Sequence, residues 1–132
     1  MQLNWLDQPP STRLSSGFPE TMVLLDCETT GGKATYHRII EIGLLVIENG
    51  ALVERWQTFI NPKVPLPPFI QRLTGISPGM VDGAPEFSEI AEELLSKLKG
   101  RTLVAHNARF DYSFLKNEFE RAGMSYNNKP LC

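Results

Sequence analysis

A short apolar run at Met22 to Leu25 limits the folds open to this chain more than any other feature. The run follows a polar stretch rich in proline and serine, and it ends at Asp26. A continuous apolar segment of this length is typical of a strand that is buried on both faces near the middle of a sheet. We therefore expect a layered α/β fold whose central strand ends in acidic side chains.

A hairpin is predicted directly after this strand. Residues 39–47 are rich in β-branched side chains, and residues 51–60 continue the same character. Asn49-Gly50 separates the two segments, and this dipeptide favours a primed two-residue turn between antiparallel strands. The hairpin would extend the sheet beside the central strand.

Helices are expected mainly in the second half of the chain. Residues 61–85 contain six prolines, so we interpret them as a stiff loop with room only for a short helix near 69–73. An amphipathic helix is predicted to begin at Pro85 and to stop at Gly100. A strand at 103–105 and a second amphipathic helix at 108–122 then complete the α/β pattern.

Composition and charge exclude several classes of protein. The 132 residues carry 13 basic and 15 acidic side chains, a net charge of −2, which argues against binding nucleic acid through bulk electrostatics. Cys27 and Cys132 are too few for a disulfide framework or a zinc site. No apolar run approaches the about 20 residues of a membrane-spanning helix, and no secretory signal is present, so a cytoplasmic protein without membrane contact is expected. We interpret residues 1–20 as an N-terminal arm and residues 21–132 as a single domain.

Two carboxylates stand at the end of the predicted central strand. Asp26 and Glu28 are two residues apart, so their side chains point to the same face of the sheet. At a separation of about 5 Å their repulsion would be about 3 kcal/mol, which would raise one pKa by about two units. A divalent cation would relieve this repulsion, and ligand crevices form at such strand ends. Cys27 between them is expected to point away from the acids as a small core side chain.

A third acid lies on the packing face of the last predicted helix. Asp111 falls within the arc covered by Phe110, Phe114 and other apolar side chains, so it requires a partner. Glu118 lies in the same arc, and we interpret it as an edge residue that reaches solvent or pairs with Arg121. Glu41, inside an otherwise apolar strand, is either a contact of the threonines that follow Glu28 or an edge carboxylate.

The acids alone leave two other interpretations open. A strand end with two carboxylates can simply cap a turn. Phosphoryl transfer through an aspartyl nucleophile also uses an apolar strand that ends in two acids two residues apart, although such sites usually carry Asp at the second position, where this chain has Glu28.

Four segments in order carry a resemblance to a known family. Residues 23–31, Val-Leu-Leu-Asp-Cys-Glu-Thr-Thr-Gly, resemble the first motif of the DEDD superfamily, the DnaQ-like 3′→5′ exonucleases, and residues 103–111 resemble its second motif. Residues 37–43 and 73–76 match the intervening segments of that family. The resemblance is strongest to the group that contains the proofreading epsilon subunit of bacterial DNA polymerase III.

The resemblance implies a ribonuclease H-like α/β fold, a mixed sheet with flanking helices that lacks the last helix of the fold. It also implies hydrolysis of phosphodiesters at DNA 3′ ends by two divalent cations, Mg²⁺ or Mn²⁺. Carried over by position, Asp26 would bridge the two ions, Glu28 would help to hold the first, and Asp111 would act on the second through water.

Several other positions match family residues that contact the substrate. His106 is not assigned as the catalytic base, because the family's base lies in a third motif on a later helix; it would orient its loop or touch substrate. Asn107, the next residue, is expected to be the N-cap of the helix predicted at 108–122. The residues that match substrate-binding positions are Thr29, Thr74, Gly75, Ile76, His106, Asn107 and Phe110.

The expected partner is a nucleic acid 3′ end, in the first place single-stranded DNA, with a DNA polymerase or a fused nuclease domain as a further partner. An exoribonuclease-like module acting on RNA is an alternative, because discrimination at the 2′-hydroxyl depends on pocket geometry. A module that binds nucleic acid or protein without catalysis is a second alternative.

One departure from the family pattern affects the expected activity. The sequence ends at 129–132, where family members enter another strand and then the helix of the third motif. The fourth acid and the base histidine of that motif are therefore absent from residues 1–132. Since a general base alone contributes about 10²–10⁴-fold, we expect residues 1–132 by themselves to be weak or inactive.

Overall fold

A computed structural model describes residues 20–128 and 130–131, so the expected arm at 1–20 lies outside the described residues except for Glu20. The chain forms one five-stranded sheet in the order β3-β2-β1-β4-β5. The strands are β1 (Thr21–Thr29), β2 (Ile39–Glu48), β3 (Ala51–Phe59), β4 (Thr102–Val104) and β5 (Pro130–Leu131). The helices are α1 (Pro68–Thr74), α2 (Pro78–Asp82), α3 (Phe87–Leu98) and α4 (Ala108–Arg121).

The predicted central strand is confirmed, because β1 lies in the middle of the sheet. It pairs antiparallel with β2 and parallel with β4, so the sheet is mixed, as expected. Side chains alternate along β1: Val23, Leu25 and Cys27 join the main core, whereas Leu24 packs with a separate cluster on the opposite face. Residues 130–131 form β5, which pairs in parallel with β4.

The predicted hairpin is also confirmed. Strands β2 and β3 pair antiparallel, with Glu48 opposite Ala51. Asn49 and Gly50 between them have φ angles of 52° and 77°. Both values lie in the left-handed region that a primed turn requires, which Asn and Gly tolerate better than other residues.

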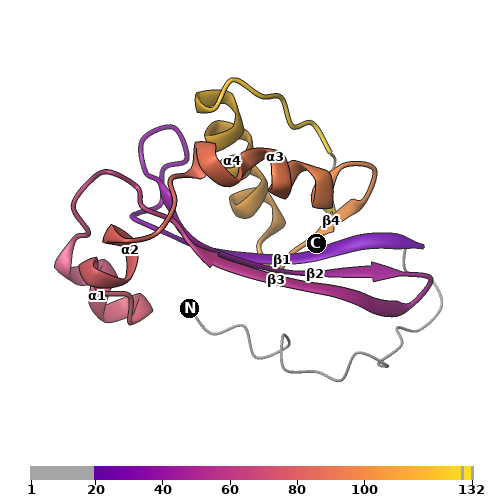
Figure 1. Ribbon diagram of the computed structural model, residues 1–132, viewed down its shortest axis with the longest axis horizontal. Coiled ribbons are helices and arrows are strands. Elements are labelled where there is room, and N and C mark those ends of the chain that lie inside the picture. Colours follow the sequence, from indigo (N-terminus) through magenta and orange to yellow (C-terminus); the bar gives the residue numbers. More distant parts are fainter. Residues whose placement is uncertain (1–19, 129, 132) are drawn as a thin grey trace.

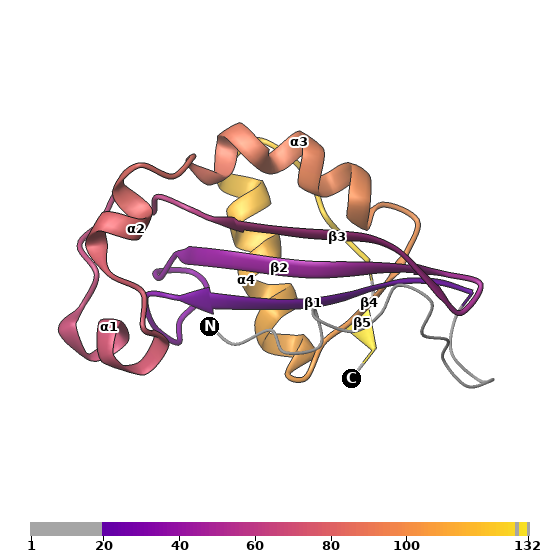
Figure 2. The ribbon, with the colours of Figure 1, turned by 60° about the horizontal axis from the view of Figure 1, so that its bottom comes forward.

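The helices are divided between one face of the sheet and one end of it. Helices α3 and α4 pack together on one face, whereas α1 and α2 lie beyond the end at which β1 finishes (Figures 1 and 2). Phe87 of α3 contacts Phe119 of α4 edge to face, with ring centroids 5.0 Å apart, at the centre of the core between these helices and the sheet. The strand end that carries Asp26 and Glu28 therefore opens toward α1.

Two details of the helix prediction were wrong. The proline-rich segment contains a second short helix, α2, because Ser77 and Pro78 provide a helix start that the prolines around them concealed. Helix α3 begins at Phe87 rather than at Pro85, since the Glu89 carboxylate accepts a hydrogen bond from the Glu86 N–H at 2.7 Å and fixes the first turn there. Across the described part of the chain, every helix is too short or too polar to cross a bilayer.

Candidate active site

The two acids of the first motif lie near the C-terminal end of β1. Asp26 and Glu28 are both partly buried, and they lie on the sheet face opposite α3 and α4. Glu28 is paired in register with Glu41 of β2, which therefore shares this face. Glu41 is almost fully buried, and its carboxylate accepts a hydrogen bond from the Gln57 side chain of β3. It is thus not the edge carboxylate that was one of our two expectations.

Burial, more than repulsion, perturbs these carboxyl groups. Loss of solvent raises the pKa of Asp26, and the nearby Glu41 carboxylate adds to the rise. Loss of solvent also raises the pKa of Glu28, with further contributions from Asp26, Glu41 and Asp111. The expected repulsion between neighbouring acids is therefore present, but it is the smaller cause.

Asp111 meets the first motif through Cys27. The Cys27 thiol donates a hydrogen bond to Asp111 Oδ1 at 3.1 Å, across 84 positions of sequence. Cys27 points away from Asp26 and Glu28 into the core, as expected, and it also contacts the third acid, which the sequence did not predict. The reason is that α4 packs on the face to which Cys27 points.

The acid on α4 is the most strongly perturbed of the three. Asp111 is only 4% exposed, and burial raises its pKa to about 6. The negative charge of Asp26 contributes to this rise, whereas the hydrogen bond from Cys27 opposes it. The carboxylates of the two motifs thus lie close enough to influence each other, although within residues 20–128 and 130–131 no three His, Cys, Asp or Glu side chains form a ready-made metal-binding group.

The raised pKa of Asp111 predicts an unusual dependence of stability on pH. A carboxyl group whose pKa rises on folding from 3.8 to about 6 stabilises the fold fully below pH 3.8, and this contribution is lost as the pH rises through about 6. In metal-free protein at pH 7.5, Asp111→Asn should therefore increase the free energy of unfolding by up to about 3 kcal/mol. Denaturant unfolding at pH 4 and pH 7.5 measures the difference, which should vanish at pH 4.

The exposed Asp82 supplies the control for this measurement. Asp82→Asn should change stability by less than about 0.5 kcal/mol at either pH. Equal stability of Asp111→Asn and the unsubstituted protein at pH 7.5 would contradict the burial of a charged carboxylate at this position.

A pocket of about 260 Å³ adjoins the acids at the end of β1. Glu28 and Thr29 form one wall, Thr74 of α1 forms another, and Phe110 of α4 closes the side nearest the core. The Thr29 hydroxyl donates to the Gly31 carbonyl at 2.7 Å, and Thr74 donates to the Ile70 carbonyl at the same distance. Three of the predicted substrate-binding residues are therefore brought together beside Glu28.

Other predicted substrate contacts lie elsewhere. Ile76 is 1% exposed and packs in a core cluster with Ile70, so its side chain is directed away from the pocket. Gly75 ends α1 with a φ of 75° and does not line the pocket. In their place, Phe69 and Leu73 of α1 form the outer wall, although they are 62% and 68% exposed. The sequence signal for this wall was the spacing of four residues between Phe69 and Leu73, which places two large apolar side chains on one side of α1.

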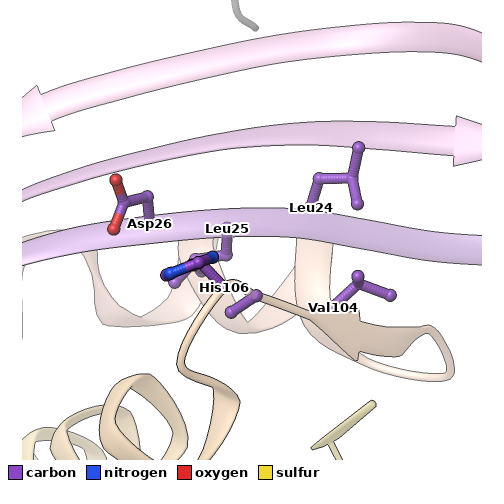
Figure 3. Close-up of a pocket in the computed structure, with 6 residues that line it drawn as sticks. Leu24, Leu25, Asp26, Val104 and His106 are labelled. Carbon is purple, nitrogen blue, oxygen red and sulfur yellow. The ribbon is translucent and has the colours of Figure 1, made fainter. Parts of the chain in front are cut away.

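His106 and Asn107 lie on the other side of Asp26. A second pocket, of about 240 Å³, is lined by Leu24, Asp26 and Val104, with His106 at its polar end (Figure 3). The charge of His106 slightly lowers the pKa of Asp26 against the larger effect of burial. Asn107 occupies the position before α4, as predicted, but its side chain makes no capping hydrogen bond.

Glu118 of α4 fixes the loop that follows the acidic strand. It is 1% exposed, and it accepts hydrogen bonds from the Arg38 guanidinium at 3.0 Å and from the Ile39 N–H at 2.8 Å. The expected ion pair with Arg121 is also present, at 3.4 Å. The alternative that Glu118 reaches solvent at the edge was wrong, because the carboxylate is buried and its shorter contacts are with Arg38.

The donor set fits a hard divalent cation. Asp26, Glu28 and Asp111 supply only carboxylate oxygens, the ligands that Mg²⁺ and Mn²⁺ prefer. Burial is the first cause of the raised pKa of each of these groups, and a bound cation would favour their charged forms. The set consists of a pair of carboxylates on β1, Asp26 and Glu28, and a third carboxylate on α4, Asp111, which accepts a hydrogen bond from Cys27.

Comparison with known proteins identifies the family of this chain and several relatives. A family model described as RNase_T exonuclease matches residues 23–131. A protein named DNA polymerase III PolC-type, from Caldanaerobacter subterraneus subsp. tengcongensis, is 43% identical over 109 residues, which are 83% of this chain and 8% of that protein. A protein named 3′-5′ exonuclease DinG, from Bacillus subtilis (strain 168), is 44% identical over 105 residues, which are 79% of this chain and 11% of that protein.

Solved structures of low sequence identity share the fold. Exonuclease I in its apo form has a TM-score of 0.72 at 19% identity, over 82% of this chain and 26% of that one. E. coli Exonuclease I in complex with a dA16 oligonucleotide has the same TM-score and identity, over 81% and 25% of the two chains. These similarities confirm the expected ribonuclease H-like fold. The match of the family model over residues 23–131 shows that the chain belongs to the RNase_T exonuclease family.

Proposed function

We propose that this domain removes nucleotides from the 3′ ends of DNA by metal-dependent hydrolysis of the terminal phosphodiester bond. The observation that carries the proposal is the hydrogen bond of 3.1 Å between Cys27 and Asp111, which joins the acidic strand end to the acid of α4. It unites the two motifs at the edge of a pocket large enough for part of a nucleotide. The names of the relatives, a PolC-type polymerase and a DinG exonuclease, support the same activity.

Each acid has a separate proposed task. Asp26 and Glu28, on one face of β1, would hold the divalent cations, and Asp111 would act from α4 through a bound water. When bound, two such ions supply an activated hydroxide and stabilise the leaving 3′ oxygen. A bound cation would thus compensate the free-energy cost of burying these carboxylates in their charged form. Cation binding is most favourable when all three carboxylates are deprotonated.

The pocket beside Glu28 would receive the terminal nucleotide. Phe110 presents an aromatic surface, and Phe69 and Leu73 add apolar walls on which a base or sugar can pack. Thr29 and Thr74 stand at the polar side of the same pocket. Single-stranded DNA is the proposed substrate, which the oligonucleotide complex of Exonuclease I supports. A polymerase or a fused nuclease domain remains the proposed partner, and the chain spans 8% and 11% of the PolC-type and DinG relatives.

Hydrolysis of 3′-labelled and 5′-labelled single-stranded DNA by the full-length protein tests the proposal. With Mn²⁺, we expect the 3′ label to be released as a mononucleotide at once and the 5′-labelled strand to shorten stepwise. Excess chelator should reduce the rate at least about 100-fold, and added Mn²⁺ should restore it, because carboxylates cannot replace the ions that activate water.

Three results would contradict it. Release of the 5′ label first would reverse the polarity, and a faster reaction on RNA of matched sequence would favour the exoribonuclease-like alternative. Binding of DNA without any hydrolysis would favour a non-catalytic module. The weak activity expected of residues 1–132 alone stays a prediction, and the same assay measures it.

A further inference from the structure

The residue between the two acids of β1 connects the two motifs. Cys27 is 6% exposed, and its sulfur lies 3.1 Å from Asp111 Oδ1. A residue that could be a simple core side chain thus follows one proposed metal-binding acid in β1 and contacts another on α4.

The chemistry of the thiol suits a permanent donor. The sulfur lies 3.1 Å from a carboxylate oxygen, and because an ionised carboxylate can only accept a hydrogen bond, the thiol is the donor of this pair. A protonated thiol can donate one hydrogen bond, and the short distance to Asp111 shows where it goes. Aliphatic side chains of similar size would fill the same space without donating.

We propose that Cys27 is a positioning residue, whose thiol holds Asp111 Oδ1 and leaves Oδ2 directed to the metal-binding acids. The inference rests on the proposed function, since it assigns Asp111 to that site. It goes further by naming the group that sets the orientation of this carboxylate. A carboxylate without this hydrogen bond would rotate about its last side-chain torsion, and losses of about 10–100-fold in metal affinity or activity follow when such supporting contacts are removed.

Two variants of the full-length protein separate the hydrogen bond from the volume of the side chain. Cys27→Val fills the space but cannot donate, whereas Cys27→Ser is smaller but can. With 3′-labelled single-stranded DNA, we expect Cys27→Val to lower kcat and raise the half-saturating Mn²⁺ concentration, each about 10–100-fold. The KM for DNA should change less than about 2-fold, and Cys27→Ser should recover most of the loss. If Cys27→Val does not fold, Cys27→Ala replaces it, because it also lacks the donor.

Two results would overturn the inference. One is activity and Mn²⁺ dependence of Cys27→Val within about 2-fold of the unsubstituted protein. The other is equal impairment by Cys27→Val and Cys27→Ser. Either result would show that the hydrogen bond donated by the thiol does not determine activity. In an Asp111→Asn background, Cys27→Val should have little additional effect, because the two residues act as one unit.

Mn²⁺ binding, measured by calorimetry without DNA, keeps this inference separate from the proposed function. If the unsubstituted protein does not hydrolyse DNA, the proposed function fails. Weaker Mn²⁺ binding by Cys27→Val than by Cys27→Ser would still support positioning by the thiol, and equal binding by the two would overturn it.

Discussion

Asp26→Asn in the full-length protein is expected to reduce 3′→5′ hydrolysis of single-stranded DNA at least about 100-fold, with the fold unchanged. Removal of a contact that only supports a metal ligand costs about 10–100-fold, so loss of a direct ligand charge should cost more. Amide and carboxylate have nearly the same shape, and the partly buried position does not require the charge for packing. The measurement is kcat at saturating Mn²⁺, with circular dichroism and thermal unfolding as tests of the fold.

A matched substitution shows whether the loss belongs to the site. Asp82→Asn removes the same charge from the exposed end of α2 and should leave kcat within about 2-fold. Glu28→Gln should behave like Asp26→Asn, because both carboxylates lie on the same face of β1. Near-normal hydrolysis by Asp26→Asn would mean that the ions are held elsewhere.

Glu118→Ala is expected to have the largest effect on stability, a loss of about 3 kcal/mol in the free energy of unfolding. Breaking a buried ion pair costs about 3–5 kcal/mol, and the partly exposed Arg38 side chain places this case near the lower limit. The buried Ile39 N–H also loses its acceptor, which adds to the loss. Denaturant unfolding measures the change.

The neighbouring Glu120 provides the comparison on the same helix. It is exposed, and Glu120→Ala should change stability by less than about 0.5 kcal/mol. Glu118 also holds the start of β2 and therefore the loop from Gly31 to His37, where the His37 ring lies against Gly31. A Glu118→Ala protein as stable as the Glu120→Ala protein would show that the buried cluster contributes little.

Local patterns predicted the parts of the fold that depend on neighbouring residues. The apolar run of β1 and the Asn49-Gly50 turn each have a backbone preference that the tertiary structure does not alter. Helix α2 was missed because a five-residue helix has no periodicity to detect, and only the Ser77-Pro78 start marked it.

The contacts of the acids could not be predicted in the same way. Alternation along β1 correctly directs Cys27 away from Asp26 and Glu28, but the face on which α4 packs decides that Cys27 meets Asp111. Likewise, helical periodicity places Glu118 on the packing face of α4 without showing that Arg38 and Ile39 lie there. Both contacts join residues about 80 positions apart in sequence, which only the assembled layers bring together.

Anomalous diffraction from crystals of the full-length protein grown with Mn²⁺ locates the ions directly. We predict one manganese peak within coordination distance, about 2 Å, of carboxylate oxygens of both Asp26 and Glu28, and a second peak beside Asp26 that is linked to Asp111 through water. At saturating Mn²⁺, the absence of a peak beside Asp26 and Glu28, or peaks only at a distant surface, would contradict the assignment of these acids.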